Sequence, residues 1–256
     1  DGEKKSIDID WSLPRKDSKG RKPEVQIDTN MSIEQACRRR DLTMNSMAIN
    51  LCSLFESLES IKKECNEKNR AINCHKALHI IDSFNGIKHI KEKKLFATDE
   101  KLFSDDPLRL FRVMQFSARF EMEPDKSLNE ICRNMDITLS NVGGELSSER
   151  IWDELKKMLL KSQKPSIGLR WLKKIDRLQE VFPEVAATVG ISQRKDYHPE
   201  GDVFEHTMQS LDATTMLDNT EETKLSGVEE KLIIMMAVLC HDLGKTTTKN
   251  KAGGFP

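Results

Sequence analysis

Residues 39–46 read Arg39-Arg40-Asp41-Leu42-Thr43-Met44-Asn45-Ser46, and residues 105–112 read Asp105-Asp106-Pro107-Leu108-Arg109-Leu110-Phe111-Arg112. Each run sets arginines beside carboxylates. Arginine binds phosphate oxygens through two parallel hydrogen bonds, and a neighbouring carboxylate can accept hydrogen bonds from ribose hydroxyls. Salt bridges on a solvated surface give the same pattern, so either run alone leaves both interpretations open. The two runs together favour a nucleotide site.

The composition fits a helix-rich protein with modest cores. Of its residues, 32% are charged and 5% are aromatic. The length of 256 residues suffices for one large domain or two ordinary ones. Its net charge of −1 predicts no polyanion partner for the chain as a whole, so such a partner needs a local basic patch. The six cysteines lack the spacing of a disulfide framework, so we expect reduced thiols and a cytoplasmic protein. We find no apolar run long enough to span a membrane and no signal peptide.

The front of the chain predicts a mixture of strands, loops and one helix. Apolar and polar residues alternate over 6–13, as in a half-buried strand. Ser32 and Gln35 form a capping-box pattern at the start of a helix. The expected elements are a strand over 6–13, a loop over 14–23, a strand over 25–27, a helix from 32 to about 54, a polar insertion over 55–78, a strand over 79–81 and a turn over 82–86.

From Asp105 onward we expect only helices. Asp106 is suited to cap the first of them, with Pro107 at its first position. Further helices are expected over 126–138, 148–161, 165–178, 204–217 and 231–243. The last of these is almost entirely apolar from 232 to 240, so it should be buried, and Gly244 should end it.

Five segments, in this order along the chain, resemble the nucleotidyltransferases that build the CCA end of tRNA and the related bacterial poly(A) polymerases. They are Asp8–Arg15, Arg39–Asn45, Asp82–Gly86, Asp105–Phe120 and Ser148–Ile151. The resemblance implies an α+β fold that is predominantly α. It places a partial nucleotidyltransferase head over 1–90, with the insertion at 55–78, and a helical neck that binds nucleotide and RNA over 91–180.

The resemblance assigns nucleotide-binding roles to Arg40, Asp41, Asn45, Asp106, Arg109 and Arg112. Asp106 and Arg109 lie three residues apart on one helix face, where the acid can accept from an exocyclic amine and the arginine can donate to a ring nitrogen. A helix cap for Asp106 and a salt bridge for Arg109 are the alternatives. The sequence departs from the family at Gln115, where a further arginine is frequent, and at Asp105, where glutamate is usual.

Nucleotidyl transfer in the family resembles two-metal chemistry with Mg²⁺ held by an Asp-x-Asp pair. Asp10 matches a third carboxylate with a catalytic role, although Asp8 and Asp10 as the pair itself remain an alternative. We expect the principal pair upstream of Asp1, and we interpret the chain, which ends at Pro256, as an internal fragment that is inactive alone.

A second resemblance lies in the back half, over 181–256. His206, His241 and Asp242 match the HD metal-dependent phosphohydrolase domain, of which the chain holds the N-terminal part. Imidazole nitrogen and carboxylate oxygen suit a divalent ion such as Ni²⁺, Mn²⁺ or Mg²⁺. Satisfied core histidines are the alternative. Further ligands are expected beyond the end of the chain, and His198 is expected either to be structural or to support the ligands, and not to bind the metal itself.

Two weaker patterns leave alternatives open. Cys65, Cys74, His75 and His79 suggest zinc, but they lack a Cys-x-x-Cys pair, so free thiols fit better. A basic stretch over 156–177, opposed there only by Asp176, suits either a tRNA backbone or a solvated helix surface.

The sequence therefore predicts a fragment of an enzyme that adds CMP and AMP to the 3′ end of tRNA without a nucleic-acid template. The expected partners are tRNA, CTP and ATP, with no membrane and no stable protein partner. A poly(A) polymerase or an enzyme adding only A or only C is the nearest alternative. An HD phosphohydrolase or phosphodiesterase and a non-catalytic RNA-binding protein are the others.

Overall fold

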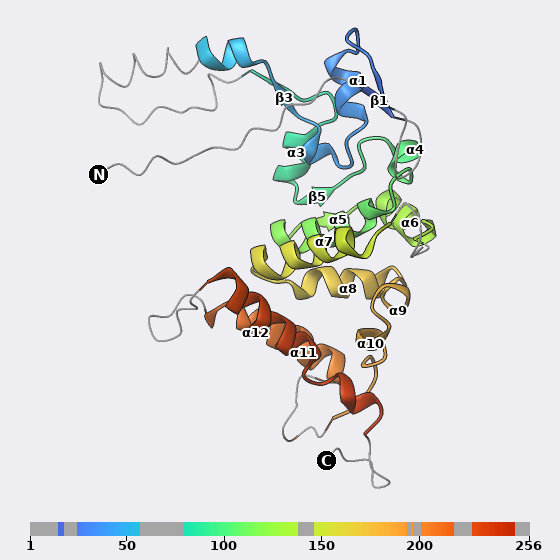
Figure 1. Cartoon of the computed structure of the whole chain (residues 1–256), viewed down its shortest axis with the longest axis vertical. Helices are drawn as coiled ribbons and strands as arrows, with labels where there is room; N and C mark the ends of the chain where they lie inside the picture. The colour runs from blue at the N-terminus through green and yellow to red at the C-terminus, as the bar shows by residue number, and fades with distance from the viewer. Residues whose placement is uncertain are drawn as a thin grey trace, which may run out of the picture.

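The computed structural model describes residues 15–17, 25–56, 79–137, 146–193, 196, 201–217 and 227–248, with backbone only for 15–17 and 25–26. Within these ranges helices dominate and strands are short, which confirms the predicted, predominantly helical α+β fold. Figure 1 shows strands and short helices at one end, the helices of 108–174 across the middle, and the helices of 203–240 at the other end.

The first described elements form a hairpin. β1 (Arg15–Asp17) pairs in antiparallel register with β2 (Val25–Ile27). The strand at 25–27 is confirmed, whereas the predicted loop over 14–23 is wrong at β1. A strand is defined by backbone pairing, so a polar, lysine-rich segment gives no local sign of it. The strand predicted over 6–13 lies outside the described residues.

The predicted helix from 32 to about 54 is broken into pieces. α1 (Ile33–Arg38) begins with the predicted capping box and ends after six residues. The chain then forms a single-turn helix, η1 (Thr43–Asn45), a short strand, β3 (Ala48–Ile49), and a helix over 51–56. The prediction of one helix was therefore wrong, although its start was right.

The break has a tertiary cause. Thr43 N–H donates to the carbonyl of Phe96 at 3.0 Å, and Thr98 N–H donates to the carbonyl of Asp41 at 3.0 Å. Leu42 lies between these bonds, bridged to Ala97 and fully buried. Long-range pairing of this kind overrides local helix preference.

The strand and turn predicted after residue 79 are present. β4 (Ile80–Ile81) pairs with β3, and the turn leads into α3 (Gly86–Lys91). Asp82 accepts the N–H groups of Gly86 at 2.6 Å and Ile87 at 2.9 Å. A Cβ at Gly86 would lie 2.4 Å from the carbonyl oxygen of Thr43, so only glycine allows α3 to approach η1 this closely.

The chain next enters the main core. The elements are β5 (Lys94–Leu95), α4 (Glu100–Phe103), α5 (Leu108–Phe120), β6 (Glu123–Pro124) and α6 (Lys126–Asn134). β5 and β6 pair in parallel, so the expectation of helices alone after residue 105 fails at β6. α5 is buried along most of its length, which makes it the central helix of the molecule.

Two helices cover α5. α7 (Ser148–Lys161) has the predicted bounds, and α8 (Ser166–Lys174) ends before the predicted residue 178. Both pack against α5. A Cβ at Gly168 would lie 2.5 Å from Met158 Sδ and 2.8 Å from the carbonyl oxygen of Met114, so α8 depends on this glycine to approach its neighbours.

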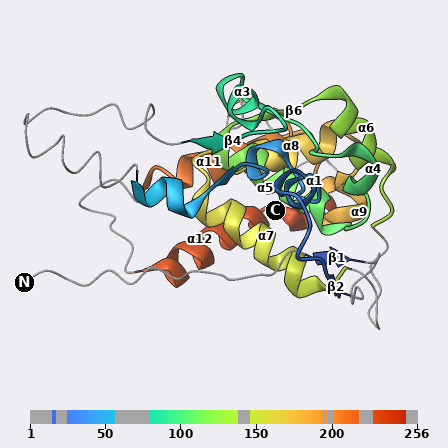
Figure 2. The same cartoon turned by 90° about the horizontal axis from the view of Figure 1, so that it is seen from above.

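The remaining elements form a helical end. They are α9 (Leu178–Val181), α10 (Pro183–Ala186), α11 (Val203–Thr214), α12 (Val228–Cys240) and η5 (Leu243–Thr246). α11 packs against α12 and α8, and α12 also contacts α7, at an angle to which it lies in Figure 2. One buried hydrophobic cluster reaches from Leu42 to Leu239, so the domain boundaries at 90 and 180 stay predictions.

The predicted burial of the apolar helix is wrong. α12 ends at Cys240, before Gly244, and within it only Met235 and Leu239 are buried. Ile233 is 68% exposed, although it lies in the apolar run. One stripe of α12 packs against α11 and α7, and within the described chain the other faces of α12 are left largely uncovered.

Candidate functional site

Asp41 lies at the centre of the first candidate site, with only 7% of its surface exposed. Its Oδ1 accepts the Leu42 N–H at 2.8 Å and the Asn45 side-chain amide at 3.1 Å, and its Oδ2 accepts from Arg112 Nε. A carboxylate offers about four acceptor positions, so about one remains for a ribose hydroxyl.

The charge of Asp41 is stabilised by its neighbours. Burial by itself would raise the pKa of this carboxyl. The positive charge of Arg112, with the hydrogen bonds from Arg112, Asn45 and the Leu42 N–H, outweighs burial and holds the pKa below its ordinary value. Asp41 is therefore ionised at neutral pH and fixes the guanidinium of Arg112.

Arg112 joins three elements. It projects from α5, pairs with Asp41 of the 39–46 segment, and lies 3.8 Å from Glu154 Oε1 on α7. Its guanidinium also lies 5.0 Å from the centre of the Phe116 ring. Arginine carries five N–H donors, so its terminal nitrogens keep donors that could bind an anion.

Glu154 was missed by the sequence analysis. It is 2% exposed, its Oε1 accepts from Lys157 at 2.8 Å, and its Oε2 has no hydrogen-bond partner within the described chain. A signal was present, because Glu154 lies next to Leu155 and one turn before Met158, among the apolar residues of the 148–161 segment. A carboxylate on the buried face of a helix needs a cationic partner.

Arg109 anchors backbone rather than acids. Its Nη1 donates to the carbonyl of Leu102 at 2.6 Å and its Nη2 to the carbonyl of Arg39 at 2.9 Å. Burial lowers the pKa of this guanidinium. The side chain thus ties the end of α4 and the start of the 39–46 segment to α5, beside the position of Arg112.

Asp106 combines a cap with an ion pair. Its Oδ1 accepts the Leu108 N–H at 3.0 Å, which supports the start of α5 as expected for a cap. Its Oδ2 accepts from Arg150 Nη2 at 2.8 Å, which links the start of α7 to the start of α5. Arg40 is exposed in the described structure, and Asp10 lies outside the described residues.

The structure therefore brings five of the seven predicted residues of this site to one junction. They are Asp41, Asn45, Asp106, Arg109 and Arg112. The junction lies where the 39–46 segment meets the N-terminal turns of α5 and α7. This arrangement offers arginine donors to an anion. The two residues expected to read the nucleobase, Asp106 and Arg109, are already hydrogen-bonded to protein partners.

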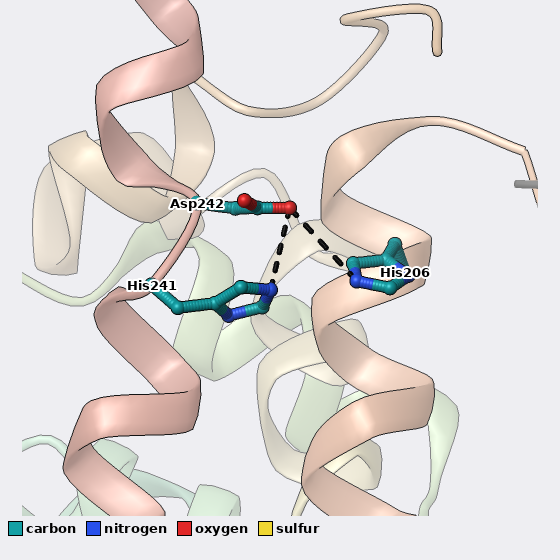
Figure 3. Close-up of side chains that lie close together, drawn as sticks. All are labelled: His206, His241 and Asp242. Carbon is teal, nitrogen blue, oxygen red and sulfur yellow. Dashed lines mark ion pairs between the residues drawn. The ribbon is translucent and has the colours of Figure 1, made fainter. Parts of the chain in front are cut away.

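The second candidate site joins His206 of α11 to His241 and Asp242, which follow α12 (Figure 3). His241 Nε2 lies 3.3 Å and His206 Nε2 lies 3.9 Å from Asp242 Oδ2. Each residue offers one ligand atom, and these atoms lie within 4.8 Å of one another. The three predicted metal ligands are thus brought together.

The donor atoms fit a divalent metal ion. His241 Nδ1 lies 2.7 Å from the carbonyl of Val238, and because a carbonyl only accepts, this nitrogen carries the proton. In a neutral His241 the lone pair would then be on Nε2, which lies 3.3 Å from Asp242 Oδ2. Bonding of the second imidazole nitrogen to a backbone carbonyl is the usual way in which a metal-binding histidine is oriented.

Two further residues of this site were missed by the sequence analysis. Lys245 Nζ lies 2.8 Å from Asp242 Oδ2 and 2.7 Å from Gln193 Oε1. Lys245 stands three residues after Asp242, a spacing that places both at one helical turn and could have indicated it. Gln193 lies 52 residues from Lys245 in the sequence, and no local pattern predicts their contact.

The alternative zinc cluster is largely untested. Cys65, Cys74 and His75 lie outside the described residues, as does His198, and His79 is exposed. The four cysteines that the structure describes, at positions 37, 52, 132 and 240, are free thiols.

The basic stretch is partly neutralised by acids from elsewhere in the chain. Five of its eight cations form ion pairs, namely Lys157 with Glu154, Lys164 with Glu121, Arg170 with Glu205, Lys174 with Glu123 and Arg177 with Glu180. Lys173 lies 4.6 Å from the centre of the Phe204 ring. The cationic surface is thus smaller than the sequence indicated.

No helix of the described chain is both long and apolar enough to cross a membrane.

Several known proteins are similar to this chain over most of its length. The family described as "Probable RNA and SrmB- binding site of polymerase A" matches residues 122–188. The "Multifunctional CCA protein" of Pasteurella multocida is 33% identical over 220 residues, which cover 85% of this chain and 44% of that protein.

Two solved structures share the fold. A CCA-adding enzyme in its apo form II aligns with a TM-score of 0.55 and 18% identity, over 89% of this chain and 44% of that one. The Bacillus stearothermophilus CCA-adding enzyme in complex with CTP aligns with a TM-score of 0.52 and 21% identity, over 86% of this chain and 41% of that one. The chain spans less than half the length of the relatives it matches.

Proposed function

Because the chain belongs to the family of CCA-adding tRNA nucleotidyltransferases and poly(A) polymerases, we propose that it serves the addition of CMP and AMP to the 3′ end of tRNA. The observation that carries this proposal is the junction of Asp41, Asn45 and Arg112, in which a buried carboxylate aligns an arginine that retains free donors. The partners proposed are tRNA, CTP and ATP.

The proposed division of labour follows the geometry. Arg112 binds the triphosphate, because Asp41 holds its Nε and leaves the two terminal nitrogens of the fork. Asn45 and the remaining acceptor position of Asp41 hold the ribose. Arg40, exposed beside them, adds a second phosphate contact.

Asp106 and Arg109 are proposed to read the base edge. Both are engaged with protein partners, Asp106 with Arg150 and Arg109 with two carbonyls. A bound cytosine or adenine must therefore replace these hydrogen bonds with equivalent ones. A base that presents a carbonyl in place of the exocyclic amine would leave Asp106 facing an acceptor, and this mismatch excludes uracil and guanine.

Asp10 is proposed as a carboxylate that helps to hold Mg²⁺ for nucleotidyl transfer. It lies outside the described residues, so its role rests on the order of motifs alone.

The test is nucleotide binding followed by addition. Calorimetric titration should show that CTP and ATP bind at least about tenfold more tightly than UTP and GTP, because unpaired polar groups at a recognition edge are costly. Equal affinity for all four nucleotides would refute base reading. In the intact protein, of which this chain is expected to be a part, addition of two CMP and one AMP to tRNA that lacks its CCA end would support the CCA enzyme, whereas a run of AMP would support the poly(A) alternative.

A second function is proposed for the other site. His206, His241 and Asp242 are proposed to bind a divalent ion such as Mn²⁺, Ni²⁺ or Mg²⁺ for a phosphohydrolase reaction, and the convergence of their ligand atoms carries this proposal. Such an ion polarises a phosphoryl group and lowers the pKa of a bound water. Asp242→Ala should abolish hydrolysis of 2′,3′-cyclic phosphates and of phosphomonoesters while leaving CTP binding unchanged.

A further inference from the structure

One oxygen of Asp242 is shared by three neighbours. Oδ2 faces His241 Nε2 at 3.3 Å and His206 Nε2 at 3.9 Å, and it accepts from Lys245 Nζ at 2.8 Å. Metal ligation by the two histidines and Asp242 would use this side of the carboxylate. An ion bound there and the Lys245 ammonium would therefore compete for one oxygen.

Gln193 gives Lys245 a second anchor. Its Oε1 accepts from Lys245 Nζ at 2.7 Å, independently of Asp242. When Asp242 turns to a metal ion, the amide oxygen keeps the ammonium at the edge of the site. Lys245 is then displaced from the carboxylate without leaving the metal centre.

The amide nitrogen of Gln193 adds a second donor. This Nε2 is buried and has no hydrogen-bond acceptor among the residues that the structure describes. Buried donors almost always have a partner, so this one calls for an acceptor that is not among the described residues, and a bound anion would supply it. Because Nε2 and Oε1 are bonded to the same carbon, this donor lies close to the oxygen that accepts from the Lys245 ammonium.

The charge balance favours an anion as that acceptor. With neutral imidazoles, the positive Lys245 offsets the negative Asp242. A divalent ion adds two positive charges to a partly buried site, and this excess is compensated by an anion. A phosphoryl group offers three oxygens, one each for the ion, the ammonium and the amide, whereas a carboxylate offers only two.

We propose, on the basis of the metal site proposed above, that Lys245 and Gln193 form its phosphate-binding side. They hold the phosphoryl group of a phosphomonoester or cyclic phosphate next to the ion. Anion binding then depends on prior metal binding, since without the ion Lys245 is paired with Asp242.

The test separates metal binding from phosphate binding. Mn²⁺ is first titrated into the full chain, and inorganic phosphate is then titrated into the Mn²⁺-loaded protein. Lys245→Met should raise the affinity for Mn²⁺, by about threefold or more, because a competing charge is removed from Oδ2. The same variant should weaken phosphate binding by at least about tenfold, because a charge-assisted hydrogen bond is lost.

Gln193→Leu provides the second variant. This variant should bind Mn²⁺ with an affinity within about twofold of that of the wild-type protein. It should bind phosphate more weakly, as expected for loss of a neutral hydrogen bond. Lys231→Met, on the first turn of α12 away from the site, is the matched control and should alter neither affinity. Circular dichroism of each variant checks that the fold is kept.

The opposite signs for Lys245→Met distinguish the proposal from a purely structural role. A structural lysine would lower both affinities together, and that result would overturn the proposal. Unchanged phosphate binding in both variants would overturn it too, as would phosphate binding that is equally tight without Mn²⁺. If the unchanged protein binds phosphate but no Mn²⁺, the metal site itself is refuted as well.

Discussion

Replacing Asp41 with Asn removes the charge that orients Arg112, while keeping the size of the side chain. The amide nitrogen of Asn would face either the Leu42 N–H and the Asn45 amide or the Arg112 Nε–H, all of which are donors. At least one donor therefore loses its acceptor. Among the described residues, the only ion pair that Arg112 would keep is the longer one with Glu154, at 3.8 Å.

The expected cost is about 2–3 kcal/mol of unfolding free energy at pH 7. Breaking a buried ion pair costs about 3–5 kcal/mol, and partial solvation of the Arg112 side chain, which is 31% exposed, reduces this. For a chain of this size, the loss corresponds to a fall in melting temperature of roughly 5–10 °C.

The pH dependence of stability gives an independent test of the role of Asp41. The folded-state pKa of Asp41 is lowered, so its stabilisation is fully present above the unfolded pKa of about 3.9 and is lost as pH falls through the folded value. The stability gap between the two proteins, measured by urea unfolding, should therefore be widest near neutral pH and close in acid.

Asp153→Asn on the exposed face of α7 is the matched control and should change stability by no more than about 0.5 kcal/mol. A double-mutant cycle with Arg112→Met should give a coupling energy of about 1–3 kcal/mol between positions 41 and 112. If Asp41→Asn is as mild as the control, or the coupling is near zero, then Asp41 does not hold Arg112.

Three further outcomes are expected. Arg109→Ala should blur the choice between CTP and ATP in binding titrations and leave tRNA affinity largely unchanged; equal loss for every nucleotide would count against base reading. Gly168→Ala should lower stability by about 1–3 kcal/mol in thermal melts, because its Cβ would lie 2.5 Å from Met158 Sδ, whereas Gly227→Ala, which has open space, should be close to neutral. Asp212→Ala should also be destabilising, by about 1–2 kcal/mol, because Asp212 accepts from Ser166 N at 3.1 Å and Ser166 Oγ at 2.6 Å; an unchanged melt would show that these bonds do not contribute.

The sequence predicted helices best where one amphipathic pattern was complete. α7 matches its predicted bounds because a serine start and a regular apolar stripe coincide. The helix from Ser32 was placed well at its start and badly at its end, since pairing of 41–43 with 96–98 has no local signature. The apolar run of α12 misled because composition does not say how many faces of a helix are covered.

Candidate site residues divide in the same way. The motifs named the arginines and acids of the first site, but Asp41 and Arg112 are 71 positions apart, so their ion pair could come only from the structure. Glu154 and Gln193 lie in no quoted motif, because their partners Arg112 and Lys245 come from distant parts of the sequence. The chemistry of a site is visible in its motifs, whereas the residues that position those motifs depend on tertiary packing.

The two candidate sites are carried by helices of one packed frame, in which α8 is the shared neighbour. α8 packs against α5, which carries Arg112, and against α11, which carries His206. Ser166 at the start of α8 bonds Asp212 of α11, and Arg170 pairs with Glu205, the residue before His206. No described side chain belongs to both sites, so substitutions in one should leave the other's ligand affinity intact. Because α8 links them, an effect of Asp212→Ala on both affinities at once would show that the frame, and not a shared ligand, couples them.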